Sequence, residues 1–74
     1  MIYFAKKDKD LVEVFNRNIM EINKAKNSKI SFIKDKNEIN ERFVDISKET
    51  GIRMPLTKSK DDINKNFLLI NKGI

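Results

Sequence analysis

Hydrophobic residues recur every three to four positions in three stretches of the chain, and the positions between them are mostly charged or amide side chains. This spacing places the apolar residues of each stretch along one face of a helix. Amphipathic helices are therefore predicted over residues 11–26, over residues 37–50 and from residue 59 to the end of the chain. Their apolar faces consist of Leu11, Phe15, Ile19 and Ile22, of Ile39, Phe43, Ile46 and Thr50, and of Ile63, Phe67, Ile70 and Ile74.

Each predicted helix is preceded by residues that are typical of a helix start. An Asp or Ser is followed three positions later by an acidic residue, which is the spacing of a capping box, where two side chains bind free backbone N–H groups of the first turn. Gly51 predicts a left-handed cap that ends the second helix. The three pairs are Asp10 with Glu13, Asp35 with Glu38 and Ser59 with Asp62.

Two short segments, residues 1–5 and 30–33, are rich in β-branched and aromatic residues and predict strands. The expected fold class is α/β or α+β, in the order strand, helix, strand, helix, connector, helix, with the helices packed on a minimal sheet. Because two strands alone make a poor sheet, a third is expected from residues 42–47, residues 52–56 or the C-terminus. A chain of 74 residues forms one domain, residues 1–74.

For two segments the sequence does not decide between a helix and a strand. Residues 42–47 could instead pair with residues 31–34 in a hairpin, since Val44 lies off the helical stripe. The four apolar residues 67–70 fit either a buried strand or the end of a helix, because so short a run does not settle the period. No internal repeat, low-complexity tract or domain linker is apparent.

The residue inventory excludes several kinds of chemistry. The chain has no His and no Cys, so zinc fingers, thiolate metal sites and His-dependent nucleophiles are absent. The carboxylates lie at predicted helix starts, where they cap the helix, or beside basic residues, where they contribute surface charge. We therefore expect no catalytic, metal or cofactor-binding residues and no enzymatic activity. The longest apolar run is too short to cross a membrane and no apolar leader follows Met1, which predicts a cytoplasmic protein.

The net charge of +5 suggests an anionic partner, but the composition weakens that interpretation. Lys, Ile and Asn, which have A/T-rich codons, dominate the sequence, and Lys outnumbers Arg 13 to 3. Arg is the better residue for bidentate phosphate and base contacts. The most basic stretch nevertheless gives a candidate nucleic-acid surface, in which a base would stack on the aromatic ring. It consists of Lys24, Lys26, Lys29, Phe32, Lys34 and Lys36. The simpler interpretation, which we favour, is a pair of lysines at a helix end and a strand whose Phe32 faces the core.

The C-terminal segment is the stronger candidate for a binding surface. Leu68 and Leu69 point away from the stripe that holds Phe67, so the last helical turns are apolar on nearly all sides. Such a helix is either buried centrally or completed by a partner. The candidate protein-binding residues are Leu68, Leu69, Ile74 and Lys72.

These observations favour a small, basic, non-enzymatic regulatory or inhibitory protein that binds a protein partner stoichiometrically. The size and A/T-biased composition are typical of phage and mobile-element proteins. The alternatives are a nucleic-acid-binding protein that uses the lysine-rich surface and a structural subunit of a larger assembly. A small core also favours association with a second copy, as a homo-oligomer.

Overall fold

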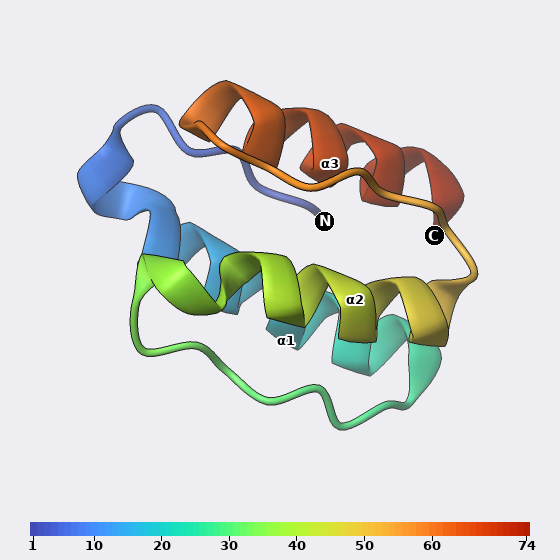
Figure 1. Cartoon of the computed structure of the whole chain (residues 1–74). Coiled ribbons are helices and arrows are strands. Elements are labelled where there is room, and N and C mark those ends of the chain that lie inside the picture. Colours follow the sequence, from blue (N-terminus) through green and yellow to red (C-terminus); the bar gives the residue numbers. More distant parts are fainter.

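The computed structural model describes residues 1–74 and contains three α-helices that are joined by extended segments. The helices are α1 (Leu11–Lys26), α2 (Ile39–Thr50) and α3 (Lys60–Gly73). Short 3₁₀ turns, η1 (Asp8–Asp10) and η2 (Lys36–Glu38), precede the first two helices. All three helices run in the same direction, and the extended segments return the chain to the end where the next helix begins (Figure 1).

The predicted α/β or α+β fold is wrong, because the chain contains no strand and no sheet. Residues 1–5 and 30–33 are extended, as β-type side chains favour, but each lies between helices and has no neighbouring strand to pair with. Neither the proposed third strand nor the hairpin forms, since residues 42–47 belong to α2 and residues 67–70 belong to α3. The predicted helix over residues 11–26 is confirmed, and the predicted second helix begins as η2 before it continues as α2.

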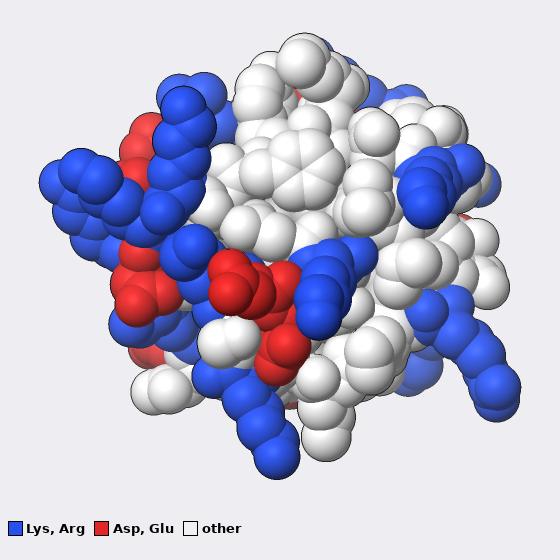
Figure 2. All heavy atoms as spheres, turned by 90° about the horizontal axis from the view of Figure 1, so that it is seen from above, with Lys and Arg blue, Asp and Glu red and all other residues white.

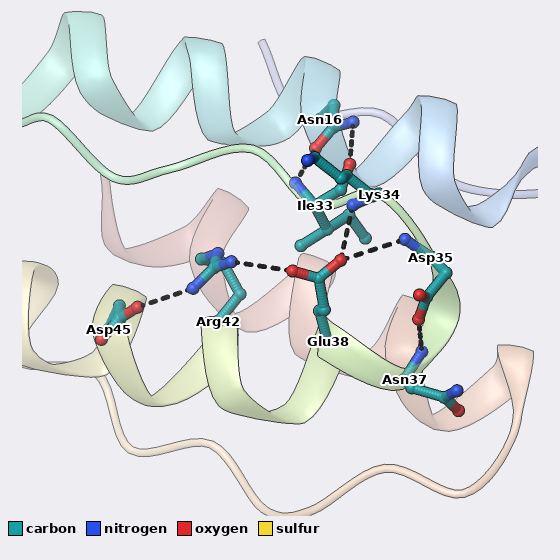
Figure 3. Close-up of polar contacts among 8 residues, drawn as sticks. All are labelled: Asn16, Ile33, Lys34, Asp35, Asn37, Glu38, Arg42 and Asp45. Atoms are coloured by element: carbon teal, nitrogen blue, oxygen red, sulfur yellow. Dashed lines mark hydrogen bonds and ion pairs between the residues drawn. The ribbon is translucent and has the colours of Figure 1, made fainter.

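Asparagine side chains take the place of a β-ladder along the extended segments. In five of six cases one Asn side chain makes two hydrogen bonds to the backbone of a single residue. Its carbonyl oxygen accepts from the N–H of that residue, and its amide donates to the C=O of the same residue. A neighbouring strand would bind the backbone in the same way. These Asn–backbone pairs are Asn18 with Tyr3, Asn64 with Ala5, Asn23 with Ile30, Asn16 with Ile33 and Asn40 with Thr57, at 2.7–3.0 Å. Figure 3 shows the pair of Asn16 and Ile33.

The sixth Asn–backbone pair has one bond in place of two. The amide of Asn66 donates to the carbonyl of Pro55 at 3.0 Å, but proline has no N–H to give in return. The carbonyl oxygen of Asn66 is consequently buried without a partner.

Three phenylalanines, one from each helix, meet at the centre of the core. The ring centroids of Phe15, Phe43 and Phe67 lie 4.9, 5.7 and 5.9 Å apart, in edge-to-face and tilted arrangements. Such geometry suits the charge distribution of aromatic rings. Isoleucines from all three helices surround the rings, so every helix buries most of the apolar stripe that its sequence predicts; the exceptions are Thr50, which is half-buried, and Ile74, which is exposed.

The chain is a threefold internal repeat, which the sequence analysis did not find. Each unit is an extended segment followed by a helix, and residues at equivalent places share their environment. Equivalent triplets are Phe4, Phe32 and Leu56, all exposed; Ala5, Ile33 and Thr57, all buried; Leu11, Ile39 and Ile63, all buried; and the three core phenylalanines. The repeat escapes inspection of the sequence because it conserves the positions of apolar residues and few identities, and because α1 is longer than the other helices.

The helix ends agree with prediction in part. Asp35 and Glu38 form the predicted capping box, and Gly51 adopts the left-handed conformation at φ 73°. The Ser59 side chain accepts from the backbone of Asp62. The predicted cap at Asp10 is wrong, because that side chain makes no capping bond and η1 already begins two residues earlier.

Candidate protein-binding face

The two sides of α3 differ sharply in their surroundings. Ile63, Phe67 and Ile70 are buried in the core, whereas Leu68 is 44% exposed and Leu69 is 38% exposed. The sequence prediction that these two leucines project away from the packed stripe is confirmed. Because a helix needs only one apolar side to join a core of this kind, the fold does not account for the second.

Lysines flank the exposed leucines along the helix. Lys65 lies one turn before Leu69 and Lys72 lies nearly one turn after it, and both lysines are exposed. Ile74 follows the last turn and lines a hollow of about 410 Å³ together with Met1, Ile2 and Asn71. All four residues predicted for protein binding therefore lie on the outside of the C-terminal half of α3 or at its end.

The first extended segment adds an aromatic residue that the sequence analysis did not consider. Asn64 binds both backbone groups of Ala5, so the segment lies along α3, on the side where Leu68 follows Asn64 by one turn. Phe4, the neighbour of Ala5, is 45% exposed at this seam. The sequence of residues 1–5 predicts a strand, in which an aromatic residue would pack on a sheet, and therefore does not mark Phe4 as a surface residue. We call the set Phe4, Lys65, Leu68, Leu69, Lys72 and Ile74 the α3 face.

Figure 2 looks down on this side of the molecule and shows a broad area without charged side chains. Acidic and basic groups mix toward the end where α3 begins, and toward the other end the visible charges are mostly basic. The acidic residues at the start of α3 are occupied in part by the fold, since Asp62 accepts from the backbone of Lys58 at 2.9 Å. The α3 face is thus an apolar area flanked by the exposed Lys65 and Lys72, with acidic and basic groups mixed where the helix begins.

The lysine-rich surface differs from its predicted form. Phe32 is 55% exposed, and its neighbour Ile33 is buried in its place, so the expectation that Phe32 faces the core is wrong. Asn16 explains this arrangement, because it fixes the backbone of Ile33 against α1 (Figure 3). The predicted lysines are all exposed and lie at the end of α1 or along the second extended segment and η2. They are Lys24, Lys26, Lys29, Lys34 and Lys36.

Carboxylates of α2 and of the η2 turn before it lie close to this lysine-rich surface. Lys29 lines one hollow together with Asp45 and Glu49. Further along, Asp35 binds the backbone of Asn37, and Glu38 accepts from the backbone of Lys34 at 2.7 Å (Figure 3). These nearby carboxylates partly offset the positive charge of the segment, which weakens its attraction for a phosphate backbone.

Two carboxyl groups have a displaced pKa, and both serve the fold. Hydrogen bonds from the backbone N–H groups of Lys34 and Asp35 hold the pKa of Glu38 below its ordinary value, with a smaller effect from Arg42. The N-terminal ammonium at 2.7 Å lowers the pKa of Glu21 in the same way. No group of three or more Asp and Glu residues lies in a position to hold a metal ion.

No family model matches the sequence, and no curated protein or solved structure is significantly similar to it. None of the helices has the length and apolar character that crossing a membrane requires. The assignment of a function consequently depends on the surfaces described above.

Proposed function

We propose that this chain is a small non-enzymatic regulatory or inhibitory protein that binds a protein partner stoichiometrically through the α3 face. The observation that carries the proposal is the exposure of Leu68 and Leu69 on a helix whose opposite side already fills the core. Contiguous exposed apolar area with a polar rim is characteristic of protein-binding surfaces. We also propose that the protein is cytoplasmic and that it comes from a phage or another mobile element.

The internal repeat gives a further reason to assign Leu69 to binding. Its equivalents in α1 and α2 are Arg17 and Asp45, which are charged and make ion pairs on the surface. The fold therefore tolerates a charged side chain at this place in two of its three helices. A leucine there is not required for packing, which supports a role in recognition.

Nucleic-acid binding is the second candidate, and the exposure of Phe32 is the observation that favours it. An exposed ring between Lys29 and Lys34 could stack on a base. A single ring with carboxylates nearby is a weak platform, so we rank this function below protein binding. The third alternative, a structural subunit of a larger assembly, would also bind through the α3 face. It differs from a regulatory protein in that the assembly contains many copies of the partner.

The experiment that tests the proposal is affinity purification from the native host with nuclease treatment, using the wild type, Leu68→Asp and Val44→Asp. Val44 occupies the place in α2 that Leu68 occupies in α3 and has similar exposure, so it is a matched control. We expect one protein partner to be retained by the wild type and by Val44→Asp and lost from Leu68→Asp.

Retention of the partner by Leu68→Asp would contradict the proposal. Recovery of nucleic acid alone, lost after nuclease treatment, would establish the second candidate in its place. Circular dichroism of all three proteins must show the same helical content, so that loss of binding is not loss of fold.

A further inference from the structure

The outer side of α3 departs from the repeat in charge as well as in hydrophobicity. Where α3 has Lys65, the equivalent positions of α1 and α2 carry Glu13 and Glu41. In α1, Glu13 forms an ion pair with Arg17 one turn later at 3.5 Å. The same two places of α3 hold Lys65 and Leu69, so an acidic–basic pair is replaced by a basic–apolar one.

The two lysines of the α3 face make no ion pair within the fold. Of the 13 lysines only Lys60 lies within ion-pair distance of a carboxylate, and the remaining ion pairs involve arginines or the N-terminal ammonium. Lys65 and Lys72 are exposed and unpaired beside the leucines. Unpaired lysines at the rim of an apolar area steer and select an oppositely charged partner.

The apolar part of the surface continues from α3 onto the first extended segment. The two hydrogen bonds between Asn64 and Ala5, at 2.9 and 2.8 Å, hold the segment along the helix. The backbone next to Phe4 is thereby held along α3 on the side of Leu68. Phe4 is 45% exposed there, and aromatic residues are enriched at protein interfaces.

We propose that the α3 face binds a protein surface that presents apolar side chains flanked by Asp and Glu, with Phe4, Leu68 and Leu69 as anchors and Lys65 and Lys72 as charge partners. This inference rests on the proposed function and adds the chemistry of the partner. A second copy of this chain fits the face poorly, because two chains that each carry +5 would bring lysines against lysines.

Two synthetic helical peptides with the same leucine stripe test the charge preference directly. One carries Glu beside the leucines and the other carries Lys at the same positions, and the affinity of each for the whole protein is measured by fluorescence anisotropy at two salt concentrations. We expect the acidic peptide to bind at least about tenfold tighter at low salt, with an advantage that shrinks as salt rises.

The repeat supplies an unusually well-matched variant for this experiment. Lys65→Glu combined with Leu69→Arg places on α3 the pair that α1 carries as Glu13 and Arg17, which the fold already tolerates. We expect this double variant to melt at the same temperature as the wild type or above it and to lose at least about tenfold in affinity for the acidic peptide. The control variant Lys48→Gln changes a lysine on α2 and should bind the acidic peptide as the wild type does.

Equal binding of the two peptides, or tighter binding of the basic one, would overturn the inference. So would unchanged affinity of the double variant, or sedimentation that shows dimers dependent on Leu68. If the basic peptide binds as tightly as the acidic one and both require Leu68, the α3 face still binds protein and only the acidic chemistry fails. If the native partner is captured regardless of Leu68, the proposed function itself fails.

Discussion

Helices α1 and α3 are equivalent on the inside of the molecule and different on the outside. Both place a phenylalanine at the centre of the core, and both hold an extended segment by asparagine side chains. On the outside, α1 carries the exposed ion pair of Glu13 and Arg17, whereas α3 carries Lys65 and Leu69 at the same places. The inner side is therefore set by the requirements of folding, and the outer side of α3 is free to be specialised for binding.

The largest expected effect is a difference in stability between substitutions at adjacent positions on the two sides of α3. Phe67→Asp places a carboxylate without a partner among the three core rings and should unfold the protein, since the cost is comparable to the stability of a small domain. Leu68→Asp should leave it folded, because that side chain is exposed. Thermal melts followed by circular dichroism distinguish the two, and unfolding by both variants would place Leu68 in the core.

A smaller effect tests whether the asparagines of α1 and α3 stabilise their extended segments equally. Asn64→Ala removes both partners of the Ala5 backbone, and Asn16→Ala does the same for Ile33. Each substitution should lower the free energy of unfolding by about 1–3 kcal/mol per backbone group left without water or protein partners.

Chemical denaturation of these two variants measures the loss, with Asn71→Ala as the control at an exposed position of α3. Equal losses would establish that the units are equivalent in energy as well as in geometry. A loss no greater than that of Asn71→Ala would mean that water satisfies the released backbone groups.

The single incomplete Asn–backbone pair offers a gain of stability. Pro55→Ala supplies an N–H where the carbonyl oxygen of Asn66 lacks a partner. The new bond should contribute about 1 kcal/mol, part of which is offset by about 0.4–1 kcal/mol from the greater freedom of the unfolded chain without proline.

We therefore expect a small rise in the melting temperature of Pro55→Ala. The same substitution in an Asn66→Ala background should give no rise, because the acceptor is gone. A rise that is the same in both backgrounds would assign the gain to the backbone and not to the asparagine.

The smallest expected effect concerns the entry of α2 and depends on pH. Because the pKa of Glu38 is lower in the folded chain than its ordinary value of 4.5, the unfolded state binds the proton more readily. The ionised Glu38 carboxylate therefore contributes fully to the free energy of unfolding at a pH above its ordinary pKa. This contribution is lost as the pH falls through the lower pKa of the folded chain. Glu38→Gln should therefore melt earlier than the wild type at neutral pH, and the difference should shrink in acid.

Glu41→Gln, one turn into the same helix, is the control for this pH dependence, because Glu41 is exposed and makes no ion pair. Convergence of the Glu38→Gln and wild-type melting temperatures at low pH would confirm the linkage. A difference that persists unchanged in acid would show that the loss is one of packing.

Helices could be predicted from the sequence because their signals are local. The spacing of Phe15 and Ile19, the capping box of Asp35 and Glu38 and the glycine at position 51 act within a few residues of one another, and all three have the predicted effect. The exposure of Leu68 and Leu69 follows from the same periodicity. Four of the six residues of the α3 face could accordingly be named before the structure was known.

The extended segments and the rest of the α3 face depend on residues that are distant in the sequence. Phe4 belongs to the face because Asn64 holds Ala5, and Phe32 is exposed because Asn16 holds Ile33. Six of the nine asparagines bind backbone in this way, although their number suggested only an A/T-rich genome.

The sequence by itself determined where this chain is helical and which side of each helix is apolar, because both follow from side chains one turn apart. Only the tertiary structure decided that the β-prone segments would lie singly between helices and not pair. An extended backbone must bond its N–H and C=O groups to something, and the sequence does not reveal whether a strand or an asparagine side chain will be near. That choice is made when three helices pack around their phenylalanines and their asparagine side chains bind the extended segments.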